Sequence, residues 1–196
     1  PAPLEPTGTP YNTGDGIYMA TAVGAKLWHM AYFAGLMRVF KLPTYGYGAF
    51  IRPPGGLRYI WTNKYGKRFV NERGFPRHGF ELRKAFLHFD ADKVEYTNIP
   101  SWVIFDEPVR KMGPMCEKYE PKKRMNRGWA VVRGDQWSED NSIEIEKGWI
   151  LKAGSIKDLA IKMGVDSSTL ENTVKKYNGY CEVGHDPDYN RPRNKM

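Results

Sequence analysis

The sequence predicts an α+β fold, with a small mixed sheet made of hairpins and helices segregated at the ends of the chain. Three observations predict it. Residues 57–72 carry a hairpin signal, in which Leu57, Tyr59 and Trp61 alternate with Arg58 and Ile60 before the turn N-K-Y-G-K. Two well-punctuated helical segments fill the last third, and no strand–helix–strand series of regular length repeats along the chain. A complete Rossmann fold is therefore not expected.

The first expected helix follows a glycine-rich turn. Asp15 lies between Gly14 and Gly16, and apolar residues then recur at helical spacing, at Ile17, Ala20, Val23 and Leu27. We expect a helix of about three turns that begins at the glycines and buries one face. Residues 1–13 hold four prolines and are expected to be an extended entry segment.

Short strands are expected in the middle of the chain. Residues 57–72 predict two antiparallel strands around the turn N-K-Y-G-K, and residues 49–52 are a further candidate strand. The apolar run 100–105 indicates a buried strand that passes into a short helix. Residues 142–154 are read as another strand pair.

A helix is also expected from Phe80 onward. Its apolar residues Leu82, Phe86 and Phe89 fall on one side. The segment before it, which contains Pro76 and Gly79, is typical of a loop.

The two helices of the last third carry their own start and stop signals. Ser155 begins a capping arrangement, and Gly164 marks the end of that helix. Asp166 or Ser167 starts a longer helix that ends before Gly184. We expect the two helices to form a tight hairpin, the second one burying a face made of Leu170, Val174, Tyr177 and Cys181.

The composition is typical of a soluble globular protein with one compact unit. Of 196 residues, 41% are apolar and 27% charged, and no apolar run approaches the roughly 20 residues of a membrane span. We expect a cytoplasmic protein. Because the sequence opens at Pro1 without an initiator Met or signal peptide, we expect it to be part of a longer polypeptide. Cys116 and Cys181 lie in no paired spacing, which predicts buried thiols and no metal site.

The net charge of +8 favours an anionic partner without identifying it. The densest basic run, K-K-R-M-N-R at residues 122–127, is either a solvated loop or a patch for nucleic acid or an acidic partner. No zinc spacing, aromatic RNA-binding stretch or helix-turn-helix pattern accompanies it, which favours the loop.

The T-G-D-G stretch that begins at Thr13 also has two interpretations. A helix start presents unpaired backbone N–H groups, and glycines let a ligand approach the backbone, so the stretch suits a phosphate or a polyol whose hydroxyls Asp15 would bind. Alternatively, Thr13 or Asp15 caps the helix and the glycines only form the turn.

Three ordered motifs between residues 12 and 191 resemble one family. N-T-G-D-G-I-Y-M-A-T-A-V-G-A-K-L-W-H-M resembles the segment after the first half of the FAD domain in the fumarate reductase and succinate dehydrogenase flavoprotein superfamily, which includes 3-ketosteroid dehydrogenases. N-K-Y-G-K-R-F-V-N-E is similar to the G-[KR]-R-F-x-N-E hairpin of its substrate-capping domain. L-A-I-K-M-G-V-D and, later, D-P-D-Y-N-R resemble the closing helices and exit of that domain.

The resemblance implies a domain that closes over FAD and encloses a small-molecule substrate for hydride transfer. It divides the chain into an entry segment at 1–16, a capping domain at 17–186 and a linker at 187–196 that returns to the flavin domain. It also implies an FAD-contacting loop formed by Asn12, Thr13, Gly14, Asp15 and Gly16.

Two departures from the family pattern qualify this inference. The dinucleotide fingerprint G-x-G-x-x-G is absent, since the stretch at Gly46 has only its first two glycines. We therefore expect the chain to hold FAD only together with the rest of the polypeptide, and to be inactive alone. The aromatic-His-Pro triplet of dicarboxylate reductases has no counterpart near residues 32–37, which favours an enoate- or ketosteroid-like substrate over fumarate.

Candidate catalytic residues follow from the same resemblance. The reductases carry a proton-donating arginine shortly after the R-F-x-N-E motif, which implies Arg77, although one residue out of register. An arginine with a pKa above about 12 would need a desolvated site and a relay. Ketosteroid enzymes use tyrosine hydroxyls, which implies Tyr45 and Tyr47 as alternatives. Each of the three has a solvated or structural role as its other interpretation.

The sequence therefore predicts the capping part of an FAD-dependent oxidoreductase that reduces or desaturates an activated C–C bond. The remaining FAD-binding portion of the same polypeptide and a small-molecule substrate are its expected partners, and no membrane is expected. The alternatives are a basic binding module and a relic of a capping domain with a scaffolding role.

Overall fold

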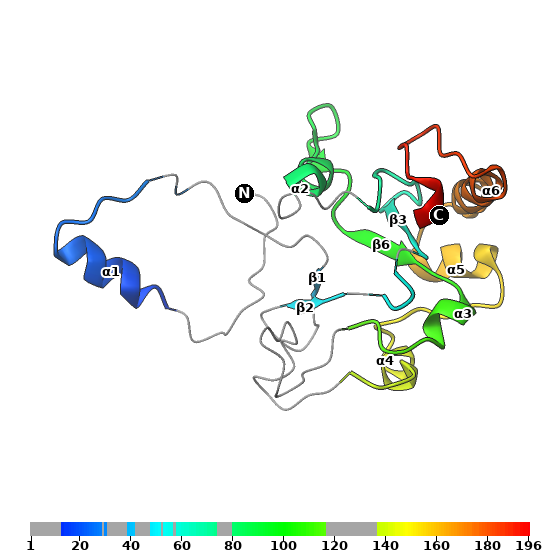
Figure 1. Ribbon diagram of the computed structural model, residues 1–196, viewed down its shortest axis with the longest axis horizontal. Coiled ribbons are helices and arrows are strands. Elements are labelled where there is room, and N and C mark those ends of the chain that lie inside the picture. Colours follow the sequence, from blue (N-terminus) through cyan, green and yellow to red (C-terminus); the bar gives the residue numbers. More distant parts are fainter. Residues whose placement is uncertain are drawn as a thin grey trace.

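The computed structural model describes residues 13–28, 30, 39–41, 48–51, 53–56, 58–73, 80–116 and 137–196 (Figure 1). Its helices are α1 (Asp15–Ala22), α2 (Phe80–Phe86), α3 (Glu107–Arg110), α4 (Ser142–Glu146), α5 (Ile156–Met163), α6 (Ser167–Val183) and the 3-10 helix η3 (Arg193–Lys195). Its strands are β1 (Val39–Lys41), β2 (Gly48–Phe50), β3 (Ile60–Asn63), β4 (Phe89–Asp90), β5 (Glu95–Tyr96) and β6 (Ser101–Ile104).

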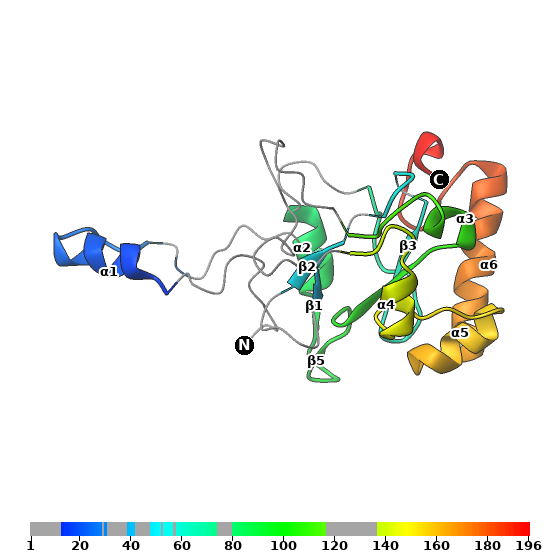
Figure 2. The same ribbon diagram turned by 90° about the horizontal axis from the view of Figure 1, so that it is seen from below.

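The central layer of the fold is the antiparallel pair β3–β6, in which Trp61 lies opposite Val103 and Thr62 opposite Trp102. Because side chains alternate between the faces of a strand, Trp61 and Val103 point to one face and pack with the buried side chains of α2. Trp102 points to the other face and packs against α5 and α6. Figures 1 and 2 show β3 and β6 between these helices.

The expected helical hairpin of the last third is confirmed. Ser155 Oγ accepts the Asp158 N–H (3.0 Å), and the Asp166 carboxylate accepts the Thr169 N–H (2.8 Å), so each helix starts at a side-chain cap. Gly164 and Gly184 follow the helix ends in the left-handed conformation. Along α6, only Leu170 of the expected face is buried, and Cys181 is exposed, so the prediction of two buried thiols holds only for Cys116.

Several other expectations are confirmed. A strand forms near the expected residues 49–52, as β2, and pairs with β1, and the helix from Phe80 is α2. β6 leads into α3, whose N-terminal cap is the Asp106 carboxylate, although β6 is half-buried rather than buried as expected. Phe89, however, lies in β4 and is exposed rather than on the buried side of α2. The mixed helices and small sheets agree with the predicted α+β class.

The predicted hairpin over residues 57–72 is only half correct. Its turn forms, because Asn63 Oδ1 accepts the N–H groups of Tyr65 (3.0 Å) and Lys67 (3.1 Å). Beyond the turn, however, a single bridge between Thr62 and Arg68 replaces a second strand. The reason is that the Trp61 N–H bonds to the Glu72 carboxylate (3.1 Å) instead of to a backbone carbonyl.

The predicted strand pair over residues 142–154 is wrong, because its first half is helix α4. Asn141 precedes the helix with φ 62°, and its Oδ1 accepts the Met115 N–H and the Trp137 Nε1–H, both at 2.8 Å. Glu144 is buried and accepts the Ser138 N–H (3.0 Å). The alternation of Ile and Glu in S-I-E-I-E therefore reflects a buried, bonded glutamate rather than the two faces of a strand.

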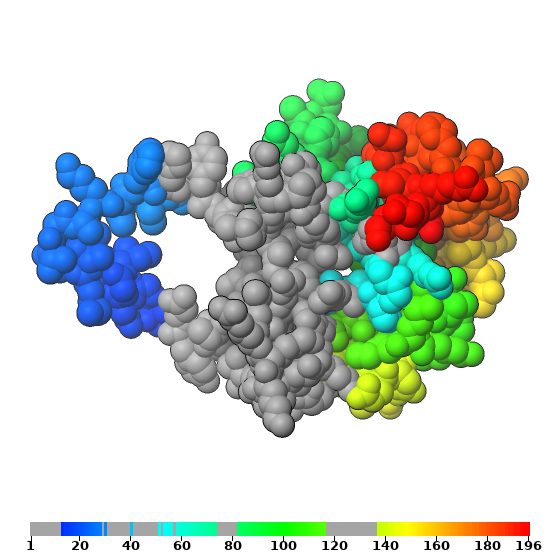
Figure 3. All heavy atoms as spheres, viewed as in Figure 1, coloured from blue at the N-terminus to red at the C-terminus, as the bar shows by residue number. Residues whose placement is uncertain are grey.

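Helix α1 starts at the glycines, as expected, but it is shorter than predicted and buries none of its residues. Its large apolar side chains, Ile17, Tyr18 and Met19, are exposed, and so is Val23, which follows the helix. Figures 1 and 2 show α1 apart from the other labelled elements, and in the space-filling view its atoms form a separate projection (Figure 3).

Among the described residues, no helix combines the length and the apolar character that crossing a membrane requires.

The packing between α5 and α6 gives a first prediction. Leu170 of α6 is fully buried and packs against Ala160 and Met163 of α5. Leu170→Ala is therefore expected to lower the free energy of unfolding by about 3 kcal/mol, because apolar burial is lost and a cavity is left behind. Val183→Ala is the control, because Val183 lies exposed on the same helix and should change stability by less than about 0.5 kcal/mol. Urea denaturation measures both. Equal effects would contradict the assigned core.

Candidate functional site

The turn before α1 is the first candidate site, and four of its five expected residues are described. Gly14 has φ 86° and precedes the helix, and Thr13 Oγ1 donates to Asp15 Oδ1 (2.9 Å). No side chain caps the helix, so the capping interpretation of Thr13 and Asp15 is wrong. Asp15 and Gly16 are exposed, and a Cβ added at Gly16 would meet no atom within 4 Å. The turn is therefore open to a ligand.

The remaining predicted site residues lie outside the described residues. These are Asn12, Tyr45, Tyr47 and Arg77, together with the basic run 122–127. Their roles therefore stay predictions.

The second feature is a buried group of four charged side chains, which we call the buried ion cluster: Arg68, Glu72, Asp186 and Arg191. Glu72 is its centre. Its carboxylate accepts Arg68 Nε (2.8 Å) and Nη2 (2.7 Å), Arg191 Nη1 (2.9 Å) and the Trp61 N–H (3.1 Å). Both guanidinium groups thus bind one carboxylate.

Asp186 completes the buried ion cluster from the C-terminal end of the chain. Its Oδ2 lies 2.8 Å from Arg68 Nη2 and accepts the Arg191 N–H (3.3 Å), while Oδ1 accepts the Tyr189 N–H (3.2 Å). The four side chains are at most 5% exposed and carry two positive and two negative charges. The cluster is therefore neutral, as a group buried this deeply needs to be.

Two tyrosines enclose the Arg68 guanidinium. It lies 4.7 Å from the ring centroid of Tyr177 on α6 and 5.0 Å from that of Tyr189, distances typical of cation–π contacts. Arg191 lies 5.3 Å from the same Tyr177 ring. The Tyr189 hydroxyl also donates to the Arg68 carbonyl (2.9 Å). Aromatic faces therefore replace water around both arginines.

Two members of the buried ion cluster, Asp186 and Arg68, have pKa values shifted in favour of their charged forms. Burial opposes ionisation of Asp186, but the Arg68 guanidinium and backbone N–H groups outweigh it and lower the pKa of the Asp186 carboxyl. Burial likewise disfavours the charged form of Arg68, whereas its bonds to Glu72 and Asp186 raise its pKa above the ordinary value. Burial raises the pKa of Tyr177, which therefore stays neutral.

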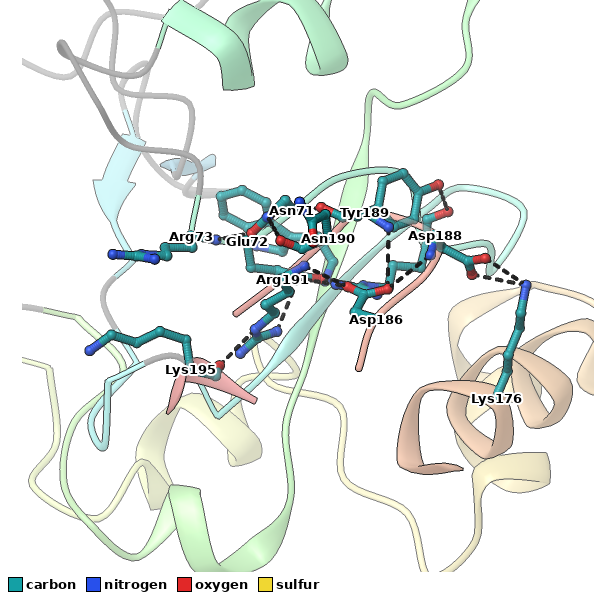
Figure 4. Close-up of polar contacts among 12 residues, drawn as sticks. Asn71, Glu72, Arg73, Lys176, Asp186, Asp188, Tyr189, Asn190, Arg191 and Lys195 are labelled. Carbon is teal, nitrogen blue, oxygen red and sulfur yellow. Dashed lines mark hydrogen bonds and ion pairs between the residues drawn. The ribbon is translucent and has the colours of Figure 1, made fainter. Parts of the chain in front are cut away.

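Figure 4 shows Glu72, Asp186 and Arg191 converging at the centre of this region. Asn71, next to Glu72, donates through Nδ2 to the carbonyls of Tyr189 (2.9 Å) and Asn190 (3.2 Å). The Arg73 side chain extends away from the cluster and is exposed. The bonds of the buried ion cluster join the segment after β3 to the C-terminal segment.

No metal site is found among the described residues, where no group of three or more His, Cys, Asp or Glu could hold an ion. His88 and His185 are exposed.

Sequence reasoning missed the buried ion cluster. The R-F-V-N-E and D-P-D-Y-N-R motifs indicate a family resemblance, but they do not indicate that their charged residues pair with one another. One signal for the cluster is present in the sequence: both motifs place charged residues next to aromatic ones. Charged side chains are almost never fully buried unless they are paired, so charges beside core positions suggest a buried partner. The pairing itself joins residues 119 positions apart, which no local pattern reveals.

Comparisons with known proteins place these features in context. A family model described as an FAD binding domain matches residues 1–196. The chain is 31% identical over 190 residues to NADH:acrylate oxidoreductase of Vibrio harveyi, covering 96% of this chain. It is 25% identical to vinyl phenol reductase of Lactiplantibacillus plantarum (96% of this chain) and 28% identical to 3-oxosteroid 1-dehydrogenase of Mycolicibacterium smegmatis (94% of this chain).

The chain spans only part of each relative: 15% of the first, 37% of the second and 29% of the third. Among solved structures, it resembles 3-ketosteroid Δ1-dehydrogenase from Sterolibacterium denitrificans in complex with 1,4-androstadiene-3,17-dione, with a TM-score of 0.62 and 23% identity. That likeness covers 97% of this chain and 31% of the other, and at this identity it concerns the fold.

The lowered pKa of Asp186 gives a prediction for the stability of the full-length protein. Because its pKa is lower in the folded state, its contribution is complete above the unfolded pKa of about 3.9 and is lost as the pH falls through the folded value. Asp186→Asn should therefore cost about 3 kcal/mol at pH 7, and progressively less below pH ~4. Urea denaturation across pH 3 to 7 measures this.

The matched control is Asp188→Asn. Asp188 pairs with Lys176 at the protein surface, where water screens the pair, so its loss should cost less than about 1 kcal/mol at any of these pH values. A pH-independent cost at Asp186 would contradict the assigned ion pairing.

Proposed function

Because the chain belongs to the FAD binding domain family, whose cofactor is FAD, we propose that it is the capping and substrate-binding part of an FAD-dependent oxidoreductase. The whole enzyme would reduce or desaturate an activated C–C bond by hydride transfer to or from the flavin. The observation that carries the proposal is the match of the family model along all 196 residues.

The names of the relatives support the type of reaction. They concern acrylate, a vinyl phenol and a 3-oxosteroid. Acrylate has a C–C double bond next to a carboxylate, a vinyl phenol has one next to an aromatic ring, and a 1-dehydrogenase forms one near a ketone. We therefore propose a substrate with a bond activated in this way, of the enoate or ketosteroid type.

The turn at Thr13, Gly14, Asp15 and Gly16 would contact the FAD. Three observations support this contact: Gly16 is exposed, α1 has no side-chain cap over its first N–H groups, and the exposed Asp15 carboxylate accepts a bond only at Oδ1, from Thr13, among the described contacts. Since the sequence lacks G-x-G-x-x-G, other parts of the polypeptide would hold the pyrophosphate.

The exposed apolar side chains of α1 support the proposed partner, the remaining FAD-binding portion of the polypeptide. A run of large apolar residues is exposed here: Ile17, Tyr18, Met19, Val23, Leu27 and Trp28. Contiguous exposed apolar surface marks an interaction site in soluble proteins. A chain that spans 15% to 37% of its relatives leaves ample polypeptide to cover it.

FAD, where bound, would supply the hydride-transfer chemistry, and residues of this chain would hold or move the proton and exclude water. We propose Arg77 as the proton donor, with Tyr45 and Tyr47 as alternatives that would donate a proton or polarise a substrate carbonyl. The capping domain at 17–186 would provide the lid, between the entry segment at 1–16 and the linker at 187–196.

The direct test uses the purified full-length protein. We expect the visible absorption of oxidised flavin, and after anaerobic reduction its recovery on adding an acrylate-type enoate or a vinyl phenol, or its bleaching by a saturated 3-ketosteroid. A colourless protein that binds no FAD would contradict the proposal. Tight binding to nucleic acid would instead support the basic module.

Two glycine substitutions test the role of the turn. Gly14 and Gly24 flank α1 with φ 86° and 91°, so an alanine strains the backbone by a similar amount, roughly 1 kcal/mol, at either position. Only Gly14 lies in the proposed FAD-contacting loop. Gly14→Ala is therefore expected to raise the Kd for FAD at least about 10-fold, and Gly24→Ala to change it little, as measured by flavin fluorescence titration. Equal effects would show that the turn serves only the helix.

A further inference from the structure

We propose that Arg191 is a latch that fixes the C-terminal segment, residues 186–196, to β3 and to the end of the β3 turn. The capping domain would then be held rigidly at its C-terminal connection, and any movement of the cap would be taken up on the side of α1. This inference rests on the proposed function, because it assumes that the chain is a cap joined to a flavin-binding remainder.

The bonds of Arg191 join three separate parts of the chain. Nη1 donates to the Tyr59 carbonyl (2.9 Å), just before β3, and to Glu72 (2.9 Å), after the turn. Nε donates to the Lys195 carbonyl (2.7 Å) within the C-terminal segment itself. The side chain is fully buried, so these bonds do not compete with water.

Further contacts hold the same segment independently of Arg191. Asp186 pairs with Arg68, and the Asn71 amide binds the carbonyls of Tyr189 and Asn190. Where the segment leaves α6, Gly184 lies so close to Arg193 that an added Cβ would be 2.6 Å from its Nε. The segment is therefore folded back closely onto the domain along its length.

The buried ion cluster couples the contributions of Asp186 and Arg191 to this attachment. Lifting the C-terminal segment would remove Asp186 and Arg191 together, leaving Arg68 and Glu72 as a less well satisfied pair in the interior. Breaking buried ion pairs in this way is strongly unfavourable, whereas small displacements keep most of the attraction. The segment is thus expected to stay attached while the fold is intact.

The other end of the chain contrasts with this. Helix α1 buries none of its residues, and glycines with positive φ, Gly14 and Gly24, flank it. Small residues at the ends of an element are a usual place for hinge rotation. In the described structure, the C-terminal segment is therefore held tightly to the domain, whereas α1 packs against none of the described core.

Hydrogen exchange of backbone amides in the full-length protein tests the latch. In the wild type, amides of residues 186–196 are expected to exchange as slowly as those of β3. Arg191→Met keeps the length of the aliphatic part but removes every bond of the guanidinium, and should accelerate exchange of residues 186–196 at least 10-fold. Amides of α5 and the first half of α6 should change less than 2-fold.

Lys176→Met is the matched control, because Lys176 binds the same segment through Asp188 but at the surface. It should accelerate exchange of residues 186–196 less than 2-fold. Two results would overturn the latch: no acceleration in Arg191→Met, or equal acceleration in α5 and α6, which would mean that Arg191 supports the whole fold. The flavin content of the same samples tests the proposed function separately, because the exchange rates can be compared whether or not flavin is bound.

Discussion

The Glu72 carboxylate binds two arginines in the interior of the protein, and the arrangement of the chain around β3 depends on this interaction. It receives Arg68 from the turn, Arg191 from the C-terminal segment and the backbone N–H of Trp61. Because the last bond takes the place of a strand partner, β6 and the turn bridge are the only pairings of β3 among the described residues. One side chain thus determines both the sheet and the path of the chain end.

The sequence predicts those elements of the fold whose stabilising contacts lie between residues close together in the chain. The caps at Ser155 and Asp166 need only neighbouring N–H groups, so both helices of the last third were predicted correctly. The strand pair at 142–154 was predicted wrongly because Glu144 is buried by a bond to Ser138, which alternation cannot distinguish from a strand face. The ion cluster joins distant segments, so its motifs were recognised while its pairing was not.

The two ends of the described chain differ in a way that fits a domain inserted in a larger enzyme. Residues 186–196 return to the domain through buried charges, whereas α1 buries none of its residues and lies apart from the other labelled elements (Figures 1 and 2). Exposed apolar surface of this kind marks an interaction site in soluble proteins, and the partner that we propose for it is the remaining FAD-binding portion of the polypeptide. In this proposal, α1 contacts the remaining FAD-binding portion of the polypeptide.

Hydroxyl-radical footprinting of the flavin-loaded full-length protein measures that contact directly. Met19 on α1 is 70% exposed in this structure and Met112, after α3, is 48% exposed, so the two methionines serve as each other's reference. If the remainder of the polypeptide covers α1, Met19 will be oxidised more slowly than Met112 despite its greater exposure here. Faster oxidation of Met19 would mean that α1 stays open to solvent, and would contradict the account.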